Sequence, residues 1–498
     1  MAQFNFPGDF KFGFSMSAFQ FEMGLPGSEN PYSDWWVWVH NPDNICAGVV
    51  SGDLPEDGPG YWHLYKVDHD IADRLGLNSA RLCLSWSRIF PKPTFEVEVE
   101  CEVKGDNILH IDVKERHLEK LDRLASRKAV KRYREILSDW KGRGKHLILN
   151  LYHFSMPKWL HNPLRARETC LREGPTGWLD KRTVVEFAKY VAYAVWMFDD
   201  LVDEWVTMNE PRAVYTEGYW TVKSGFPPGI LSLKAMLKAK KNLVEAHARA
   251  YDVIKTFSKK PVGLLYDVYA IEPLNRGDEK AAEEARKTEV YDFLNAVTRG
   301  VISWLEGEVR EDLKGKLDWL GVNYYTRLVV TSVKGPPGFG WRPVPGYGRN
   351  CKPNSLSKDG RPTSDFGWEF YPEGLKNVLV DLYERYRLPL MVTENGVADE
   401  KDILRPSFVV SHLYQVYLAL KEGVNVRGYL HWALTDNYEW AHGFSMRFGL
   451  CHVDFKTKKR FLRPSAFILG EIARRKGIPE ELQHLAKPAI REKGSTWR

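Results

Sequence analysis

Eight short apolar runs alternate with longer helix-forming segments along the chain, and this alternation is the feature that most restricts its fold. The runs are residues 11–17, 79–86, 146–153, 204–209, 261–268, 317–324, 389–393 and 427–432. Runs of this length are typical of buried strands, and buried strands that alternate with helices form a parallel sheet. We therefore predict an α/β fold, a single (β/α)8 barrel of the TIM type with long loop insertions. A doubly wound open sheet is the structural alternative.

Three of the segments between the runs carry further predictions. Residues 233–257 predict a helix with one apolar face, and residues 114–145 predict a heavily charged helix that is solvated on one side. Residues 334–362 are rich in glycine and proline and predict a long ordered loop, a kind of segment that is often functional. Its glycines lack the strand–turn–helix context of a phosphate-binding loop, so we expect no nucleotide. Because no repeat or low-complexity linker divides the chain, we expect residues 1–498 to form one domain.

Charge and hydropathy argue against nucleic-acid and membrane proteins. The chain has 498 residues, 71 of them basic and 65 acidic, and this small excess gives no dense basic stripe for nucleic acid. The basic run from Lys238 to Lys241 lies among helix-forming residues and is interpreted as a solvated face. The longest apolar run, 190–198, is far shorter than the about 20 residues of a membrane-spanning helix. The N-terminus lacks the basic and apolar regions of a secretory signal, so we expect a cytoplasmic protein.

The cysteines and the motif search give no signal for a metal. None of the six cysteines forms a C-x-x-C pair, which excludes zinc-finger and thioredoxin-like patterns. They are Cys46, Cys83, Cys101, Cys170, Cys351 and Cys451. We expect free, buried thiols, with disulfides left open for a hyperthermophilic source. Neither an H-E-x-x-H helix nor a calcium-binding loop occurs, so we expect no metal and no cofactor.

Polar and aromatic side chains follow most of the predicted strands, and in such a barrel the carboxyl ends of the strands form the active site. The side chains at or after the strand ends are Gln20, Glu22, Trp86, Arg88, His153, Asn209, Glu210, Asn323, Tyr324, Tyr325, Glu394, Asn395, His431, Trp432, Asp436, Glu439 and Trp440, and Arg81 lies near the beginning of the second run. Glu210 and Glu394 each directly follow an apolar run, 184 positions apart, and therefore come from opposite halves of the barrel. Two carboxyl groups that face each other across a pocket suit glycoside hydrolysis.

Both glutamates also have a purely structural interpretation, because a strand-end glutamate can cap the next helix or pair with a basic residue. Their neighbours favour a functional one. Pro211 is expected to hold Glu210 in an extended conformation, and Gly396 allows the chain to turn sharply after Glu394. The other candidates have comparable alternatives, since a histidine can be a hydrogen-bonded core residue, an arginine can form a structural ion pair and a tryptophan can belong to the core.

Seven sequence motifs follow one another along nearly the whole chain. They are Phe12-Gly13-Phe14-Ser15 with Phe19-Gln20-Phe21-Glu22, Ser85-Trp86-Ser87-Arg88-Ile89-Phe90-Pro91, Leu151-Tyr152-His153-Phe154, Thr207-Met208-Asn209-Glu210-Pro211, Gly321-Val322-Asn323-Tyr324-Tyr325, Val392-Thr393-Glu394-Asn395-Gly396, and His431-Trp432 with Asp436-Asn437-Tyr438-Glu439-Trp440. In this order they resemble the motifs of glycoside hydrolase family 1, and most closely those of its archaeal, thermophilic β-glycosidases and β-galactosidases.

The resemblance implies a retaining β-glycosidase. Glu394 would be the nucleophile that forms a covalent glycosyl-enzyme, and Glu210 the acid/base, with the two carboxyl groups about 5–5.5 Å apart. Arg81 and Tyr325 would hold the charge of Glu394, and Asn209 would bind the 2-hydroxyl of the sugar. The substrate-binding residues would be Gln20, His153, Glu439 and Trp440 for the other glycone hydroxyls, Trp432 for the sugar face and Trp368 for the leaving group.

The resemblance also implies small carbohydrate substrates: β-glucosides and β-galactosides first, with β-mannosides and β-fucosides as further candidates. Relatives that act on 6-phosphorylated sugars lack an acid at the position of Glu439, so this anionic residue favours unphosphorylated glycosides. Met16, Ala18 and Phe154 depart from the family pattern, and two of them, Met16 and Phe154, leave the glycone preference open. The archaeal relatives are often tetrameric, so we expect a homo-oligomer, a tetramer or a dimer.

The sequence leaves three other functions open. A transglycosidase uses the same chemistry with a sugar in place of water. A sugar-binding barrel would keep the pocket without turnover. Another barrel enzyme, such as a metal-dependent isomerase, would lose activity in the presence of a chelator.

Overall fold

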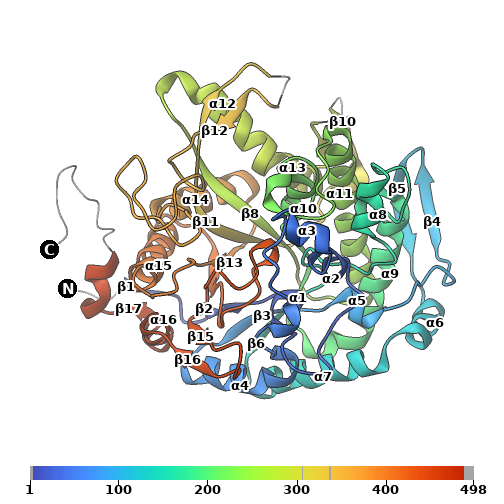
Figure 1. Cartoon of the computed structure of the whole chain (residues 1–498), viewed down its shortest axis with the longest axis horizontal. Helices are drawn as coiled ribbons and strands as arrows, with labels where there is room; N and C mark the ends of the chain where they lie inside the picture. The colour runs from blue at the N-terminus through green and yellow to red at the C-terminus, as the bar shows by residue number, and fades with distance from the viewer. Residues whose placement is uncertain (1–3, 305–306, 336–337, 487–498) are drawn as a thin grey trace.

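Eight parallel strands close into a barrel in the computed structural model, which describes residues 4–304, 307–335 and 338–486. In ring order the strands are β2 (Lys11–Ser15), β3 (Ser79–Cys83), β6 (His146–Asn150), β7 (Glu204–Asn209), β8 (Val262–Pro273), β11 (Trp319–Ser332), β13 (Leu390–Asn395) and β14 (Val426–His431). Parallel pairing of β8 with β11 and of β14 with β2 completes the ring. The predicted (β/α)8 barrel is confirmed, every predicted strand forms, and the open sheet is excluded (Figure 1).

The barrel interior is a packed apolar core. Six strands each contribute one buried side chain to it, namely Ile148, Val206, Leu265, Trp319, Met391 and Leu430. Every residue of β3, β7 and β13 is buried, because one face of each strand meets the interior and the other meets the surrounding helices. Burial on both faces explains why these strands are continuous apolar runs in the sequence.

Helices cover the outside of the barrel. The longest are α4 (Tyr61–Arg74), α7 (Arg127–Gly142), α9 (Lys181–Phe198), α11 (Leu233–Phe257), α14 (Glu373–Tyr386), α15 (Arg405–Lys421) and α16 (Pro464–Arg475). The helix predicted at 233–257 is confirmed as α11, and the apolar run 190–198 belongs to α9. In the described parts of the chain, no helix is both long enough and apolar enough to cross a membrane.

The single charged helix predicted at 114–145 is wrong, because this segment forms two helices, α6 (Glu115–Leu124) and α7. The hydroxyl of Ser126 accepts a hydrogen bond from the backbone N–H of Ala129 at 3.3 Å. A serine in this position caps the start of a helix, so the chain begins a new helix here instead of continuing the old one.

The solvated face predicted for the basic run in α11 is wrong at Lys240. This side chain is 3% exposed, and its ammonium group lies 3.2 Å from a carboxylate oxygen of Asp292 and 4.1 Å from the ring centroid of Trp304. A buried ammonium group needs a charge partner, and the carboxylate and the aromatic face supply it.

Long insertions surround the barrel. The hairpin of β4 (Glu100–Lys104) and β5 (Asn107–Asp112) projects at one edge of the molecule (Figure 1). The loop predicted at 334–362 contains β12 (Trp341–Pro343), which pairs with the far end of β11 and borders the barrel mouth. Within this loop, Pro336 and Pro337 lie outside the described residues.

All six cysteines are free, but the prediction that they are buried holds only for Cys83 and Cys451. Cys83 lies on a barrel strand, where both faces are covered. The others lie on insertions with solvated surfaces and are exposed or, in the last case, half-buried: Cys46, Cys101, Cys170 and Cys351.

Candidate active site

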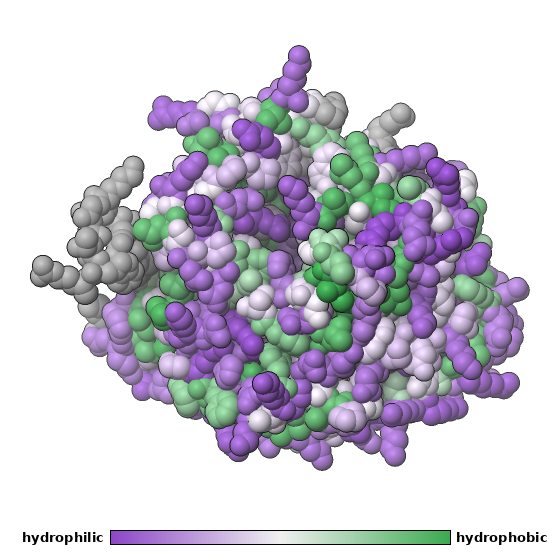
Figure 2. Space-filling view, viewed as in Figure 1, coloured by the Kyte–Doolittle hydropathy of each residue, from purple (hydrophilic) through white to green (hydrophobic). Residues whose placement is uncertain are grey.

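A cavity of about 1110 Å³ opens at the carboxyl ends of the barrel strands. Figure 2 shows the surface hollowed near the centre of this face. Nine of the eleven predicted site residues line the cavity: Gln20, His153, Glu210, Tyr325, Trp368, Glu394, Trp432, Glu439 and Trp440. The other two, Arg81 and Asn209, are buried behind the lining and contact it. The fold therefore brings all the candidates together, while their individual roles stay predictions.

Two donors hold Glu394 in place near the end of β13. Arg81, from β3, forms an ion pair with one carboxylate oxygen of Glu394, and the hydroxyl of Tyr325 donates to the other at 2.6 Å. Burial raises the pKa of the Glu394 carboxyl, and the charge of Arg81 and the hydrogen bond from Tyr325 reduce that rise without cancelling it, so the pKa is raised less than that of Glu210. Both oxygens thus have contacts that favour the charged form.

The carboxyl group of Glu210 has a different environment. Glu210 lies between β7 and α10 (Pro211–Tyr219), and the side-chain amide of Asn323 donates to its Oε1 at 2.6 Å. Burial raises the pKa of Glu210 well above its usual value, and the negative charges of Asp267 and Glu394 add to that rise. The protonated form is favoured here, so the two carboxyl groups differ as an acid and a nucleophile must.

The backbone of Glu210 differs from the prediction. Its φ of 43° and ψ of 60° are left-handed, not extended. The following Pro211 disfavours the right-handed helical conformation, and the chain passes from β7 into α10 with Glu210 in the left-handed one. The N–H of Glu210 donates to the carbonyl of Leu265 on β8 at 2.9 Å, which anchors the turn. Non-glycine residues in such conformations are concentrated at functional sites.

Gly396 is needed for a different reason from the one predicted. Its φ does not lie in the left-handed region, so no sharp turn requires a glycine here. A Cβ at this position would instead clash with the carbonyl oxygen of Trp432. The glycine therefore permits the close approach of the chain after β13 to the chain after β14.

His153 connects groups behind the pocket. Its Nδ1 lies 3.0 Å from Nη1 of Arg81, and its Nε2 lies 3.2 Å from the side-chain amide of Asn209. Burial and the charge of Arg81 lower the pKa of His153 well below its usual value, so the imidazole is neutral. His153 is therefore a hydrogen-bonded buried histidine, as the structural interpretation predicts, but its ring also lines the cavity.

Gln20 and Glu439 form a polar pair in the cavity wall. Nε2 of Gln20 lies 3.1 Å from Oε2 of Glu439 and 3.1 Å from Oδ1 of Asn437. Burial raises the pKa of Glu439 to about 8, and the charge of Glu394 adds to that rise. The protonated form predominates at neutral pH. The fixed negative charge expected to repel a sugar phosphate is therefore weakened.

Aromatic rings border these polar groups. Trp432 and Trp440 are buried, and each stacks with the ring of His153 at a centroid distance of 5.9 Å. Trp368 is half-buried and lines the cavity. Phe154 packs against Trp440 at 5.1 Å, so this departure from the family pattern acts on the pocket through a neighbouring ring as well as directly.

Three residues at the site received no role from the sequence. Asn323 contacts Glu210, and its strand-end position was the available signal. Arg212 and Asp267 form a buried ion pair and line the same cavity. Arg212 directly follows Pro211, and Asp267 lies at the end of an apolar run, so both also had a strand-end signal. Among the described residues, no cluster of His, Cys, Asp and Glu side chains is arranged to hold a metal ion.

Comparison with known proteins identifies the family. The family model for glycosyl hydrolase family 1 matches residues 2–102 and 123–478. A β-galactosidase of Sulfolobus acidocaldarius is 52% identical over 97% of each chain, and one of Pyrococcus woesei is 44% identical over 96% of this chain and 99% of its own. The structure of a β-glycosidase from the hyperthermophile Thermosphaera aggregans, 54% identical, matches 97% of this chain and 100% of that one with a TM-score of 0.94. The chain is therefore a glycoside hydrolase and belongs to glycosyl hydrolase family 1.

Proposed function

We propose that the protein is a retaining β-glycosidase that removes terminal β-linked glucose or galactose from glycosides and oligosaccharides. The observation that carries the proposal is the pair Glu210 and Glu394, which line one cavity but have different neighbours: negative charges raise the pKa of Glu210 further, whereas Arg81 and Tyr325 limit the rise at Glu394. The activities named for the relatives, β-galactosidase and β-glucosidase, support the substrate class.

The reaction has two displacements. In the first, a carboxylate oxygen of Glu394 attacks the anomeric carbon, the bond to the leaving oxygen breaks, and Glu210 gives that oxygen its proton. The product is a covalent glycosyl-enzyme. In the second, Glu210, now a carboxylate, takes a proton from water as the water oxygen attacks the anomeric carbon and releases Glu394. Two inversions give net retention, which requires carboxyl groups about 5–5.5 Å apart.

The neighbouring residues have supporting roles in this proposal. Arg81 and Tyr325 hold Glu394 as a carboxylate before attack, and Asn209 binds the 2-hydroxyl, whose hydrogen bond strengthens in the transition state. Glu439 in its protonated form both donates and accepts, which suits a sugar hydroxyl. The remaining contacts are Gln20, His153 and Trp440 with other hydroxyls, Trp432 with the sugar face and Trp368 with the leaving group.

Covalent trapping tests the proposal. In a 2-deoxy-2-fluoro-β-glucosyl substrate with a dinitrophenyl leaving group, the fluorine slows both steps and the leaving group speeds only the first. We expect the intact mass to rise by one fluoroglucosyl group and peptide mapping to place it on Glu394. The variant Glu394→Gln is the control and should stay unlabelled. A label elsewhere, or no label on an enzyme that hydrolyses aryl β-glucosides, contradicts the proposal.

Two further measurements define the substrate and the second step. The ratio of kcat/KM for aryl β-glucosides, β-galactosides, β-mannosides and β-fucosides gives the glycone preference. Product analysis at high acceptor concentration separates hydrolysis from transglycosylation, because a transglycosidase gives mainly longer glycosides. Any catalytic hydrolysis contradicts a sugar-binding barrel without turnover.

We also propose that residues 1–498 form one catalytic domain that assembles into a homo-oligomer. The family match over residues 2–102 and 123–478 supports the first part. A similar β-glucosidase variant, 53% identical, derives from a hyperthermophilic tetrameric structure and supports the second. Light scattering tests the assembly, and a mass equal to that of one chain contradicts it.

A further inference from the structure

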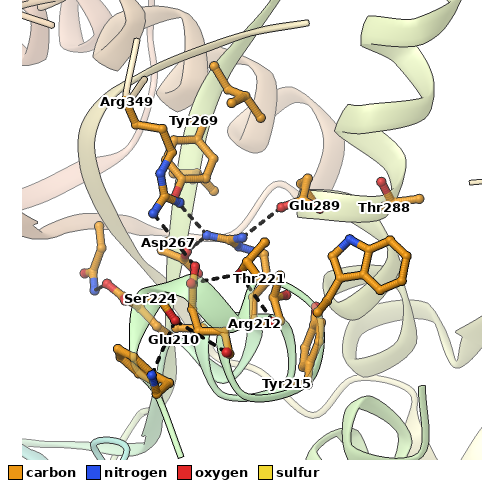
Figure 3. A pocket seen from close by; sticks show the side chains of 18 of the residues that line it. Glu210, Arg212, Tyr215, Thr221, Ser224, Asp267, Tyr269, Thr288, Glu289 and Arg349 are labelled. Atoms are coloured by element: carbon orange, nitrogen blue, oxygen red, sulfur yellow. Dashed lines mark hydrogen bonds and ion pairs between the residues drawn. The ribbon is translucent and has the colours of Figure 1, made fainter. Parts of the chain in front are cut away.

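A buried charged cluster beside Glu210 has no role in the proposed reaction. Arg212 is 3% exposed and forms an ion pair with Oδ2 of Asp267. Its Nη1 lies 2.8 Å from Oε2 of Glu289, and its Nη2 lies 3.0 Å from the hydroxyl of Tyr269. Figure 3 shows Arg212 between Asp267 and Glu289, with Glu210 on the Asp267 side.

The strand register carries Asp267 to the position of Glu210. Leu265 pairs with Asn209 across β7 and β8, its carbonyl accepts the N–H of Glu210, and its side chain fills the barrel interior. Asp267 is two residues farther along β8, so its side chain lies on the same face and nearer the mouth. On the other side, Asp267 pairs in register with Asn323, whose amide contacts Glu210 at 2.6 Å. Contacts from β8 and β11 therefore position both Glu210 and Asp267.

Arg212 orients Asp267 but contacts only one of its oxygens. Oδ1 of Asp267 is buried without a hydrogen-bond partner in the part of the chain that the structure describes. Arg212 is shared with Glu289, which lies on the π-helical turn Lys287–Tyr291, a feature that is frequent at functional sites. One guanidinium therefore faces two carboxylates, and its charge does not cancel that of Asp267 alone.

We propose that Asp267, oriented by Arg212, is a positioning residue that keeps Glu210 protonated for its role as the acid. This inference rests on the proposed function, because it requires Glu210 to be that acid. The groups that face Glu210 are Glu394 on β13 with Arg81 of β3 behind it, Asp267 on β8, Arg212 on α10, and the neutral Asn323 and Tyr325 on β11. Asp267 and Glu394 raise the pKa of Glu210, and Arg212 lowers it.

The test is the pH profile of kcat/KM, measured with two substrates that differ in their leaving groups. The quantity compared is the pH at which kcat/KM falls on the alkaline side, the alkaline limb. In Asp267→Asn a negative charge is lost, so Glu210 should lose its proton at lower pH. For phenyl β-glucoside, whose departure needs the acid, we expect the limb to move down by about one pH unit. For 2,4-dinitrophenyl β-glucoside, which departs without a proton, we expect no move. A structural disturbance affects both substrates alike, so equal shifts, or no shift, overturn the proposal.

Two further variants sharpen the test. Glu289→Gln removes a carboxylate from the same guanidinium at a position not facing Glu210, and its shift should be less than half that of Asp267→Asn. An equal shift overturns a direct effect of Asp267. If Asp267→Asn fails to fold, the double variant R212Q/D267N removes the ion pair as a whole. Its limb should still lie below that of the wild type, and an unchanged limb overturns the proposal.

Failure of the proposed function would look different. If Glu210 is not the acid, Glu210→Ala should slow phenyl and dinitrophenyl β-glucosides by the same factor, and azide should not restore its activity. If Glu210→Ala instead slows the phenyl substrate selectively while Asp267→Asn leaves the alkaline limb unchanged, only the role of Asp267 is overturned.

Discussion

The side-chain amide of Asn323 donates a 2.6 Å hydrogen bond to the carboxyl group of Glu210, and this contact reaches from β11 across β8 to the end of β7. It fixes the position of the carboxyl group. It also lowers the pKa of Glu210 and so opposes the effect of burial, which is larger. One amide therefore both places the proposed acid and limits how tightly it holds its proton.

Asn323→Ala should separate these two effects. Loss of the hydrogen bond removes a contact that lowers the pKa of Glu210, so the alkaline limb of kcat/KM for phenyl β-glucoside should move to higher pH. Loss of positioning should reduce kcat/KM at the optimum by about 10- to 100-fold. A pH–rate profile of the variant beside the wild type measures both, and a limb that moves to lower pH contradicts this account.

Glu394→Gln should abolish turnover without loss of the fold. The amide keeps the shape of the side chain and an oxygen that can accept from Tyr325, but it is not a nucleophile. We expect kcat to fall by on the order of 10⁴-fold or more for aryl β-glucosides. Near-ultraviolet circular dichroism should match the wild type. Activity within a factor of 100 of the wild type, after removal of contaminating enzyme, would exclude Glu394 as the nucleophile.

Glu210→Ala should affect substrates according to their leaving groups. Phenyl β-glucoside needs a proton on departure, so its kcat/KM should fall by about 10²- to 10⁴-fold. The dinitrophenyl substrate should keep most of its kcat/KM, since its leaving group needs no acid. Azide attacks the glycosyl-enzyme without a base, so it should raise kcat for this substrate and give a β-glucosyl azide. An α-azide, or no rescue, contradicts the double displacement.

The barrel strands were predictable because burial on both faces leaves apolar runs in the sequence. The ends of two of them were not. β8 continues to Pro273 and β11 to Ser332, beyond the predicted runs, and beyond a register shift the extensions pair with each other, from Arg327 with Ala270 onward. These extensions rise above the barrel, where the faces are covered unevenly and the pattern is no longer continuously apolar. The local sequence therefore predicts the strands of the barrel wall but not the two-stranded extension of β8 and β11 beyond it.

The site was predictable where a strand end carries a residue into the cavity, as for Glu394 and Trp432. The site was not predictable where a contact with a residue distant in the sequence determines where a side chain lies. Asp436 follows the same strand as Glu439, yet it does not line the cavity, because Arg463 binds both of its oxygens at 2.9 and 3.0 Å. The role of Asp267 likewise depends on the register between β7 and β8, which the sequence pattern does not specify.

Asp436→Asn should destabilise the fold in a pH-dependent way. Asp436 is fully buried, and burial would raise its pKa, but hydrogen bonds from His452 and Arg463 outweigh burial and lower the pKa below 3.8. A carboxyl group with a lower pKa in the folded state stabilises it above the unfolded pKa, and this contribution is lost as pH falls through the folded pKa. At pH 7 the variant leaves the buried Arg463 without its charge partner, so the free energy of unfolding should fall by about 3–5 kcal/mol.

Unfolding by guanidinium chloride at pH 7 and at pH 3 measures this change in the free energy of unfolding. The difference between variant and wild type should be large at pH 7 and should shrink at the lower pH, because in the unfolded wild type this carboxyl group, with an ordinary pKa of about 3.9, takes up a proton there. Asp454→Asn is the matched control, since Asp454 lies in a neighbouring turn and accepts hydrogen bonds from Lys456 and Thr457 near the surface. Its effect at pH 7 should be much smaller. Equal midpoints for Asp436→Asn and the wild type at pH 7 would show that Arg463 does not depend on this carboxylate.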